Sequence, residues 1–204
     1  MALIYIVRHG ETEWNASGRI QGHTDVTLSE KGRRQAQILG RRLAQVPFHA
    51  AYASDLRRAS ETAKIILGER AVSLETTAQL REYQKGVFEG LTNDEIERRY
   101  PEQFAASVIN DLDFAPTGGE SIRQTTARLA EFVGQVRQRH LEGNVLLVGH
   151  GGSLRSAVVA LLELPLEANW KFVMGNCALS IVETYSDNAV LRLYNDTSHL
   201  QGMR

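Results

Sequence analysis

The sequence contains a single cysteine, Cys177, among its 204 residues. One cysteine cannot form a disulfide within the chain, which excludes a small secreted fold held together by disulfides. We therefore expect a protein of the reducing cytoplasm. Repeats, low-complexity tracts and linkers are missing too, so the chain is expected to form one domain over residues 1–204.

Long apolar runs are also missing. Residues 2–7 form too short a run for a signal peptide and follow no basic segment. Residues 157–162 form another run, far below the length that spans a membrane. We therefore expect a soluble intracellular protein with no membrane partner.

An excess of charge of one sign is the third missing feature. The formal net charge is −1, with 43% hydrophobic and 23% charged residues, as in an ordinary globular protein. Nothing in this balance favours nucleic acid or an anionic membrane as a partner. Only four of the 23 basic residues are lysine. Arginine is the better bidentate ligand for phosphate, although most of these arginines should be solvated surface residues.

Short apolar segments alternate with amphipathic segments along the first third of the chain. Strands are predicted over residues 3–7, 50–53 and 72–74. Ser29 is a plausible N-cap for a helix that runs to about Val46 before Pro47, and a second helix from Arg57 should stop at Gly68.

Between residues 80 and 119 the periodicity weakens, and we expect a small helical cap inserted into the fold. A capping box at Thr92 predicts a short helix to Tyr100, and Pro101 should start another. Later elements are a long helix after Ser121, a strand at 145–148, a helix to Leu164 and a hairpin at 179–194. The pattern predicts a three-layer α/β/α fold with a mostly parallel central sheet and one antiparallel edge element.

Cationic or imidazole side chains follow three of the predicted strands. They are Arg8 and His9, the pair Arg57–Arg58, and His150. Carboxyl ends of parallel strands meet at one edge of a sheet, so these groups should gather around one point. A bound phosphate would relieve their repulsion and accept forked arginine hydrogen bonds. Gly10, Gly151 and Gly152 would allow the backbone to approach closely.

The motifs around these residues resemble the histidine phosphatase superfamily, the phosphoglycerate mutase-like proteins. The matching segments, which run in order from residue 3 to about residue 200, are RHGETEWN (8–15), GRIQG (18–22), LSEKG (28–32), SDLRRASETA (54–63), LRE (80–82), FEG (88–90), GGES (118–121) and VGHGG (148–152). Each segment alone is weak evidence. Together and in this order they are strong evidence.

The resemblance implies a role for each matching residue. His9 would be the nucleophile that accepts the phosphoryl group, and Glu82 would be the general acid and base, with a pKa raised by the phosphate dianion. Phosphate-binding residues would be Arg8, Arg58, His150, Asn15, Gln21, Gly22 and the Gly151 amide. The resemblance implies neither a metal nor another cofactor, because arginines supply the neutralising charge.

Simpler interpretations of several residues stay open at this point. Asn15 and Gln21 could be turn formers, and Arg57 a solvated charge on a helix. His199 in the tail could fold back over the pocket or lie in a frayed terminus. Trp170 and Phe172 favour a core or an interface over a substrate contact. His23, His49 and His140 lack the spacing of metal ligands.

The leading hypothesis is a phosphomonoester phosphatase that works through a phosphohistidine on small phosphorylated metabolites, such as phosphoserine, α-ribazole phosphate or a sugar or glycerate phosphate. The resemblance implies that mutases carry a longer segment between the acid and the second histidine. Here only 67 residues separate Glu82 from His150, and the segment is rich in acidic residues. A bisphosphoglycerate-dependent phosphoglycerate mutase and a phospho-ligand binding module are the alternatives. Residues 170–173 and the late hairpin are candidates for a homodimer face.

Overall fold

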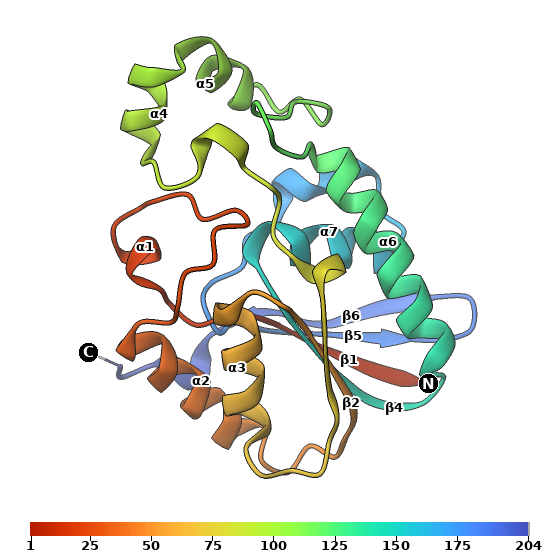
Figure 1. The fold of residues 1–204 in the computed structure, drawn as a ribbon. Helices are drawn as coiled ribbons and strands as arrows, with labels where there is room; N and C mark the ends of the chain where they lie inside the picture. Colours follow the sequence, from red (N-terminus) through yellow and green to blue (C-terminus); the bar gives the residue numbers. More distant parts are fainter. Residues whose placement is uncertain (204) are drawn as a thin grey trace.

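The computed structural model describes residues 1–203 and places a six-stranded sheet at the centre of the molecule (Figure 1). Its strands are β1 (Ala2–Arg8), β2 (Phe48–Ser54), β3 (Leu74–Thr77), β4 (Gly143–Gly149), β5 (Leu179–Thr184) and β6 (Ala189–Asp196). Their order is β3-β2-β4-β1-β5-β6; the first four are parallel, and β5 and β6 pair antiparallel. The predicted mostly parallel sheet with an antiparallel edge is confirmed.

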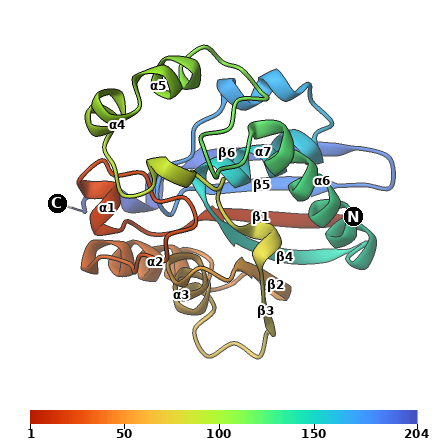
Figure 2. The same ribbon diagram turned by 45° about the horizontal axis from the view of Figure 1, so that its top comes forward.

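Helices cover both faces of this sheet because its strands are apolar on both sides. Ile4 and Ile6 of β1 belong to a core with residues of α6 (Ile122–Arg139) and α7 (Gly151–Leu161). Tyr5 and Val7 point to the other face, into a core with residues of α2 (Glu30–Arg42) and α3 (Arg57–Leu67). This alternation along one strand produces the predicted three layers, which Figure 2 shows more nearly edge-on.

The cap rises above the carboxyl ends of the parallel strands (Figures 1 and 2). It consists of α4 (Asn93–Arg99), α5 (Pro101–Ser107) and the turns around them. Thr92 accepts a hydrogen bond from the Glu95 amide, and the Glu95 carboxylate accepts one from the Thr92 amide, so the predicted capping box is present. A loop that carries the one-turn helix α1 (Glu13–Ala16) lies beside the cap.

Strand register brings the predicted chemical groups together. Arg8 at the end of β1 pairs with Gly149 at the end of β4, so His9 and His150 follow neighbouring positions of the sheet. The His9 amide donates to the Gly149 carbonyl over 2.9 Å, which continues the ladder into the loop. Arg58 lies in the first turn of α3, close to the end of β2, the other neighbour of β4.

Element boundaries differ from prediction where local signals are weakest. α2 ends at Arg42, not near Val46, and β3 covers Leu74–Thr77, not 72–74. The helix α7 ends at Leu161, and a separate 3-10 segment, Leu166–Lys171, follows Pro165. The short α1 is a helix that the sequence pattern does not predict. In residues 1–203 there is no helix whose length and apolarity would let it cross a membrane.

Candidate active site

A cavity of about 180 Å³ lies at the carboxyl edge of the sheet. It is lined by Arg8, His9, Asn15, Arg19, Ile20, Gln21, Gly22, Arg58, Glu82 and Lys85. Seven of the nine predicted site residues belong to this lining. The other two adjoin it: the imidazole rings of His150 and His9 lie 5.1 Å apart, and Gly151 lies against the Arg8 guanidinium. We call this space the phosphate cavity.

His9 is held as a neutral imidazole. Its Nδ1 lies 2.7 Å from the Gly10 carbonyl oxygen, which can only accept, so the proton resides on Nδ1 and Nε2 keeps its lone pair. Burial and the charges of Arg58 and Arg8 bring the pKa of His9 well below its ordinary value. A buried neutral imidazole with a free Nε2 has the protonation state that a nucleophile requires.

His150 has the opposite tautomer. Arg58 Nε donates to His150 Nδ1 over 3.0 Å, so the proton of this neutral ring is on Nε2. That Nε2 is buried and has no hydrogen-bond partner among residues 1–203. Burial, with the charge of Arg58, lowers the pKa of His150 well below its ordinary value. A buried donor without a partner costs free energy, and an anion in the phosphate cavity would satisfy it.

The two arginines are fixed by backbone carbonyls. Arg58 is fully buried and donates to the carbonyls of Thr24 and Gly22, each over 2.7 Å. Arg8 donates to the Met174 carbonyl, and its Nε is buried without a partner among the described residues. Neither guanidinium forms an ion pair within residues 1–203. Burial lowers the pKa of Arg58 to about 10, which leaves it protonated at neutral pH.

Glu82 docks on the N-terminus of α7. Its carboxylate accepts hydrogen bonds from the amides of Gly152, Ser153 and Tyr83 at 2.9, 2.8 and 3.0 Å. Burial alone would raise its pKa, but these amides and the Lys85 charge outweigh burial and lower the pKa. The predicted raised pKa is therefore not found in the protein without phosphate. Gly152 is needed here, because a Cβ at that position would lie 2.6 Å from Glu82 Oε1.

A family model of the histidine phosphatase superfamily (branch 1) matches residues 4–197, nearly the whole chain. The chain belongs to the histidine phosphatase superfamily. Phosphoserine phosphatase 1 from Hydrogenobacter thermophilus is 32% identical over 98% of this chain and 95% of its own length. Probable phosphoglycerate mutase GpmB from Yersinia pestis is 34% identical over 98% of this chain and 95% of its own. The α-ribazole phosphatase from Shigella flexneri superposes with a TM-score of 0.90 at 28% identity, covering 95% of this chain and 96% of that one.

Among the predicted residues of this histidine phosphatase, three come from the first long loop. Asn15 accepts a hydrogen bond from the Asn176 amide group and caps α1 with Thr12. Gln21 lines the phosphate cavity with a buried Oε1 that has no partner in residues 1–203. Gly22 has a φ of +53°, and its carbonyl accepts from Arg58. The loop residues therefore act both as turn formers and as part of the cavity wall.

Sequence reasoning missed the residues that fasten this loop. The Glu89 carboxylate accepts from the amides of His23, Thr24 and Lys85 at 2.9 to 3.0 Å. His23 Nε2 lies 2.8 Å from the Glu82 carbonyl oxygen. Glu89 belongs to a matching motif, so its position was a signal, but only the fold shows that it binds loop amides.

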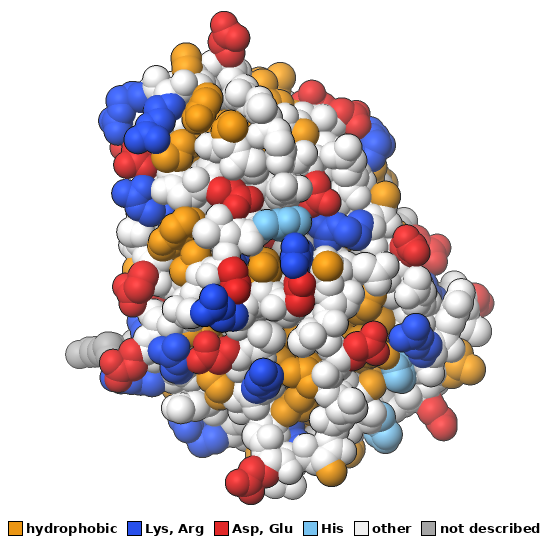
Figure 3. Space-filling view, in the orientation of Figure 1, with side chains coloured by type: hydrophobic (Ala, Val, Ile, Leu, Met, Phe, Trp, Pro, Cys, Tyr) orange, Lys and Arg blue, Asp and Glu red, His pale blue; other side chains and the backbone are white. Residues whose placement is uncertain are grey.

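Other candidates lie away from the phosphate cavity. His199 contacts Arg42 and the Cys177 carbonyl, so the described tail rests against α2 and is neither frayed nor folded over the phosphate cavity. Arg57 is exposed and pairs with Asp25. In the described part of the chain no cluster of three or more His, Cys, Asp or Glu could hold a metal. Basic and acidic side chains are interspersed over the face in Figure 3.

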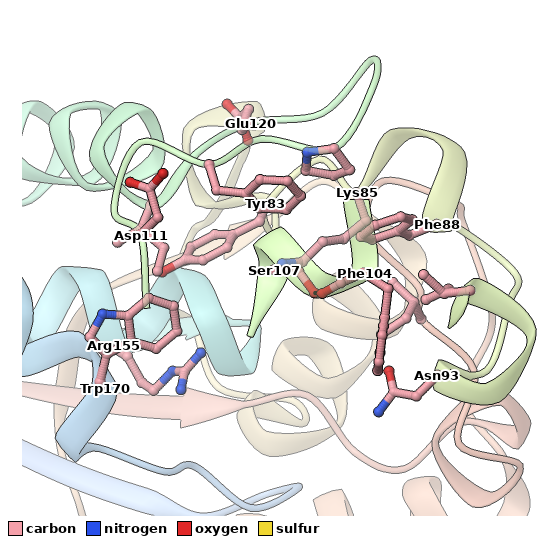
Figure 4. Close-up of a pocket in the computed structure, with 15 residues that line it drawn as sticks. Tyr83, Lys85, Phe88, Asn93, Phe104, Ser107, Asp111, Glu120, Arg155 and Trp170 are labelled. Carbon is pink, nitrogen blue, oxygen red and sulfur yellow. Dashed lines mark hydrogen bonds between the residues drawn. The ribbon is translucent and has the colours of Figure 1, made fainter. Parts of the chain in front are cut away.

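A second cavity, also of about 180 Å³, lies under the cap, and we call it the cap cavity. Five of its fifteen lining residues are aromatic: Phe114 and, labelled in Figure 4, Tyr83, Phe88, Phe104 and Trp170. The sequence favours a core or interface position for Trp170, but this residue lines the cap cavity and is 38% exposed. Ile20 and Lys85 line both cavities, so the two adjoin.

Proposed function

We propose that this histidine phosphatase hydrolyses small phosphomonoesters through a phosphohistidine formed on His9. The observation that carries the proposal is the pair of opposite tautomers. His9 Nδ1 is tied to the Gly10 carbonyl, which leaves Nε2 to attack, while His150 Nε2 carries a proton that lacks a partner among residues 1–203. One ring is arranged as a nucleophile and the other as a donor to an oxyanion.

In the first step, His9 Nε2 bonds to phosphorus as the bond to the leaving oxygen breaks. Charge on the equatorial oxygens would be stabilised by Arg8, Arg58 and His150, which are fixed before the substrate arrives. Glu82 would supply the proton to the leaving alkoxide. Arrival of a phosphate would raise the pKa of Glu82 from its low value, because like charges oppose ionisation.

In the second step, water attacks the phosphohistidine. Glu82, now ionised, would accept a proton from that water, the P–N bond would break, and His9 would return to its neutral state. The relatives support this chemistry: one is named a phosphoserine phosphatase and a solved neighbour an α-ribazole phosphatase. Phosphoserine, α-ribazole phosphate and sugar or glycerate phosphates are the substrates that we propose.

A phosphoglycerate mutase is the second candidate, because the relative from Yersinia pestis carries that name. A mutase would return the phosphoryl group to a second hydroxyl, whereas a phosphatase transfers it to water. We favour water as the acceptor of the phosphoryl group because the phosphate cavity adjoins a second open space. Arg8, Glu82, Gly151 and Val173 are among the residues that line this space.

The decisive experiment combines trapping with product analysis. Quenching with an alkaline denaturant during turnover should trap a phosphoenzyme in the wild type that survives alkali and is lost on acid treatment, and none in His9→Ala, whose activity should be abolished. Phosphate release without isomerised product, with or without bisphosphoglycerate, is the result expected of a phosphatase. Isomerised 3-phosphoglycerate without free phosphate would establish the mutase, and undiminished turnover in His9→Ala would remove His9 from the mechanism.

The proposal also includes a cytoplasmic location and a homodimer. Cys177 is buried and unpaired, which is consistent with a reducing compartment. Val173 is 68% exposed and Trp170, three residues before it in the chain, is 38% exposed, and exposed apolar side chains of this kind are often covered by subunit contacts. The mass in solution, measured by light scattering, tests the dimer.

A further inference from the structure

The cap cavity contains a lysine whose charge has no partner. The Lys85 ammonium forms no hydrogen bond and no ion pair within residues 1–203, and it lies over the Tyr83 ring, 4.8 Å from Nζ to the centroid. Burial lowers the pKa of Lys85, while the charges of Glu82 and Glu120 act in the opposite direction. Lys85 is half-buried, so its ammonium is partly desolvated, and an anionic group of a ligand in the cap cavity would supply the acceptor that the described residues do not.

Arg155 of α7 is a second cation of this kind. Its Nη1 donates to the Phe172 carbonyl over 3.2 Å, and its Nε is buried without a partner in the described chain. It forms no ion pair with any described residue. Arg155 lines the cap cavity and also the neighbouring space formed with Arg8, Glu82 and Gly152. Figure 4 shows Lys85 and Arg155 on opposite sides of the cap cavity.

Nearby basic residues outside the cavity walls are neutralised. Arg81 pairs with Asp55 at 2.6 Å, and Arg128 pairs with Glu120 at 2.9 Å. Glu120, an acidic residue of the cap cavity wall, is therefore already engaged with Arg128. Arg81 and Arg128 thus have carboxylate partners, whereas Lys85 and Arg155 have none among the described residues. This difference indicates that Lys85 and Arg155 bind an anionic ligand.

Both cations flank Glu82, the proposed donor to the leaving oxygen. A substrate whose phosphate occupies the phosphate cavity must place its leaving oxygen at Glu82 and extend its alcohol portion beyond it. The cap cavity begins there, since Lys85 lines both spaces. The next groups that such a substrate meets are therefore Lys85 and Arg155.

We propose that Lys85 and Arg155 form a subsite for a second anionic group, so that this enzyme prefers phosphomonoesters whose alcohol portion carries a carboxylate or a second phosphate. The apolar and aromatic side chains of the cap cavity would reduce contact with water there and strengthen these charge-assisted contacts. The inference rests on the proposed phosphatase function and names the chemical class of its substrate. Both residues are specificity residues here, because they contact the part of the substrate that does not react.

The test compares substrates that differ in one group. Glycerol phosphate has a hydroxymethyl group where 3-phosphoglycerate has a carboxylate, and glycerol bisphosphate has a second phosphate there. We expect kcat/KM to be about tenfold to hundredfold higher for at least one of the two compounds with a second anionic group than for glycerol phosphate, the range of one or two charge-assisted hydrogen bonds. Preference for the carboxylate or for the bisphosphate identifies the natural anion.

Variants then assign the preference to the two cations. Lys85→Met and Arg155→Met should each reduce the preference about tenfold, mainly through KM, and the conservative Lys85→Arg should restore part of it. Measurement of all substrates at one pH cancels any effect of Lys85 on the titration of Glu82. Arg98→Gln removes an equal charge from an exposed position of α4 outside the cavity and should leave the preference unchanged.

Hydrolysis of p-nitrophenyl phosphate separates failure of this inference from failure of the proposed function. If the wild type hydrolyses p-nitrophenyl phosphate but shows equal kcat/KM for all three glycerol compounds, the subsite is refuted and the phosphatase stands. The subsite is equally refuted if Lys85→Met and Arg155→Met both retain the wild-type preference. If the variants fail to fold, the inhibition constants of the three compounds against p-nitrophenyl phosphate in the wild type decide, with equal constants overturning the subsite.

Discussion

The phosphate cavity and the cap cavity share a boundary but are built in different ways. Arg8, His9 and His150 leave two buried strands whose backbones are in register, so their positions follow from the ladder of the sheet. Most of the cap cavity wall comes from 3-10 turns, two helices of seven residues each and irregular loops, and Ile122 of α6 and Arg155 of α7 complete it. The phosphate cavity is fixed by backbone pairing of strands, and the cap cavity by packing of side chains from several segments.

This structural difference corresponds to a difference in the part of the substrate that each cavity would bind. The phosphate group is the same in every phosphomonoester, so its site can depend on a rigid sheet edge. The alcohol portion differs between substrates, and it meets the cap, where irregular segments can change without disturbing the sheet. Glu82 stands at the boundary: it precedes the cap helices in sequence, yet α7 amides hold its carboxylate.

The largest predicted loss of activity concerns Glu82, the residue at the boundary of the two cavities. Glu82→Gln cannot donate the proton that an alkoxide needs, so hydrolysis of an alkyl phosphate should slow by about a hundredfold or more, the usual range for general acid catalysis. p-Nitrophenyl phosphate has a stable leaving group, and its kcat should fall by less than about tenfold. Steady-state kinetics with both substrates measures the difference.

Glu97→Gln on the exposed face of α4 is the matched control, because it makes the same change outside both cavities. Its kinetics should equal those of the wild type. Equal slowing of both substrates in Glu82→Gln would show that Glu82 orients the water or supports α7. Glu82 would then belong to the positioning framework of the sheet edge and would not protonate the leaving group.

A second prediction uses the two buried imidazoles of the sheet edge; the cap segment, residues 80–119, contains no histidine. In the folded protein the pKa values of His9 and His150 are well below 6.5, whereas in the unfolded chain they return to about 6.5. The unfolded chain therefore binds protons first as pH falls. The stabilisation is complete above the unfolded pKa and is lost as pH decreases below it.

Each of these histidines should contribute a slope of up to about 1.4 kcal/mol per pH unit to the free energy of unfolding below about pH 6. Urea titrations at several pH values in phosphate-free buffer measure the slope. In His9→Asn it should be smaller by about 1.4 kcal/mol per pH unit. A slope that is unchanged in His9→Asn would mean that His9 titrates normally and is not held neutral.

The sequence predicted the sheet edge and the two cap helices, but it did not predict the cap cavity, for physical reasons. Arg8, His9, Arg58 and His150 follow apolar runs of strand length, and parallel strands must end at one edge, so their proximity could be inferred without coordinates. Lys85 lies in a segment without clear periodicity. Lys85 lines both cavities because of the way the cap folds over the sheet, and no local sequence pattern predicts this arrangement.

Glu82 shows the limit within the active site itself. Its role was implied by a motif, but the direction of its pKa in the free protein was not, because the largest of the causes that lower the pKa is the amide of Gly152, seventy residues away, ahead of the Lys85 charge and the amides of Tyr83 and Ser153. The shift of β3 from 72–74 to Leu74–Thr77 has the same origin, since pairing with β2 selects that segment over the more apolar one before it.

The smallest predicted effect asks what holds the cap on the sheet edge. Arg19 Nη1 donates to Glu95 Oε2 and to the Gly90 carbonyl, both at 2.7 Å, and a pair of backbone hydrogen bonds joins Ile20 to Gly90 and Leu91. Glu95→Gln removes the ion pair but keeps a residue suited to the capping box of α4. Because exposed ion pairs contribute little, KM should rise by less than about threefold and Tm should change only slightly.

The backbone pairs should therefore keep the cap in place when the ion pair is lost. Thermal unfolding and kinetics of Glu95→Gln, with Glu97→Gln as the control on the same helix, measure both quantities. A loss of substrate preference as large as that expected for Lys85→Met would show that the ion pair positions the cap cavity. The cap would then depend on one charged contact for its shape, unlike the sheet edge, whose register rests on many backbone hydrogen bonds.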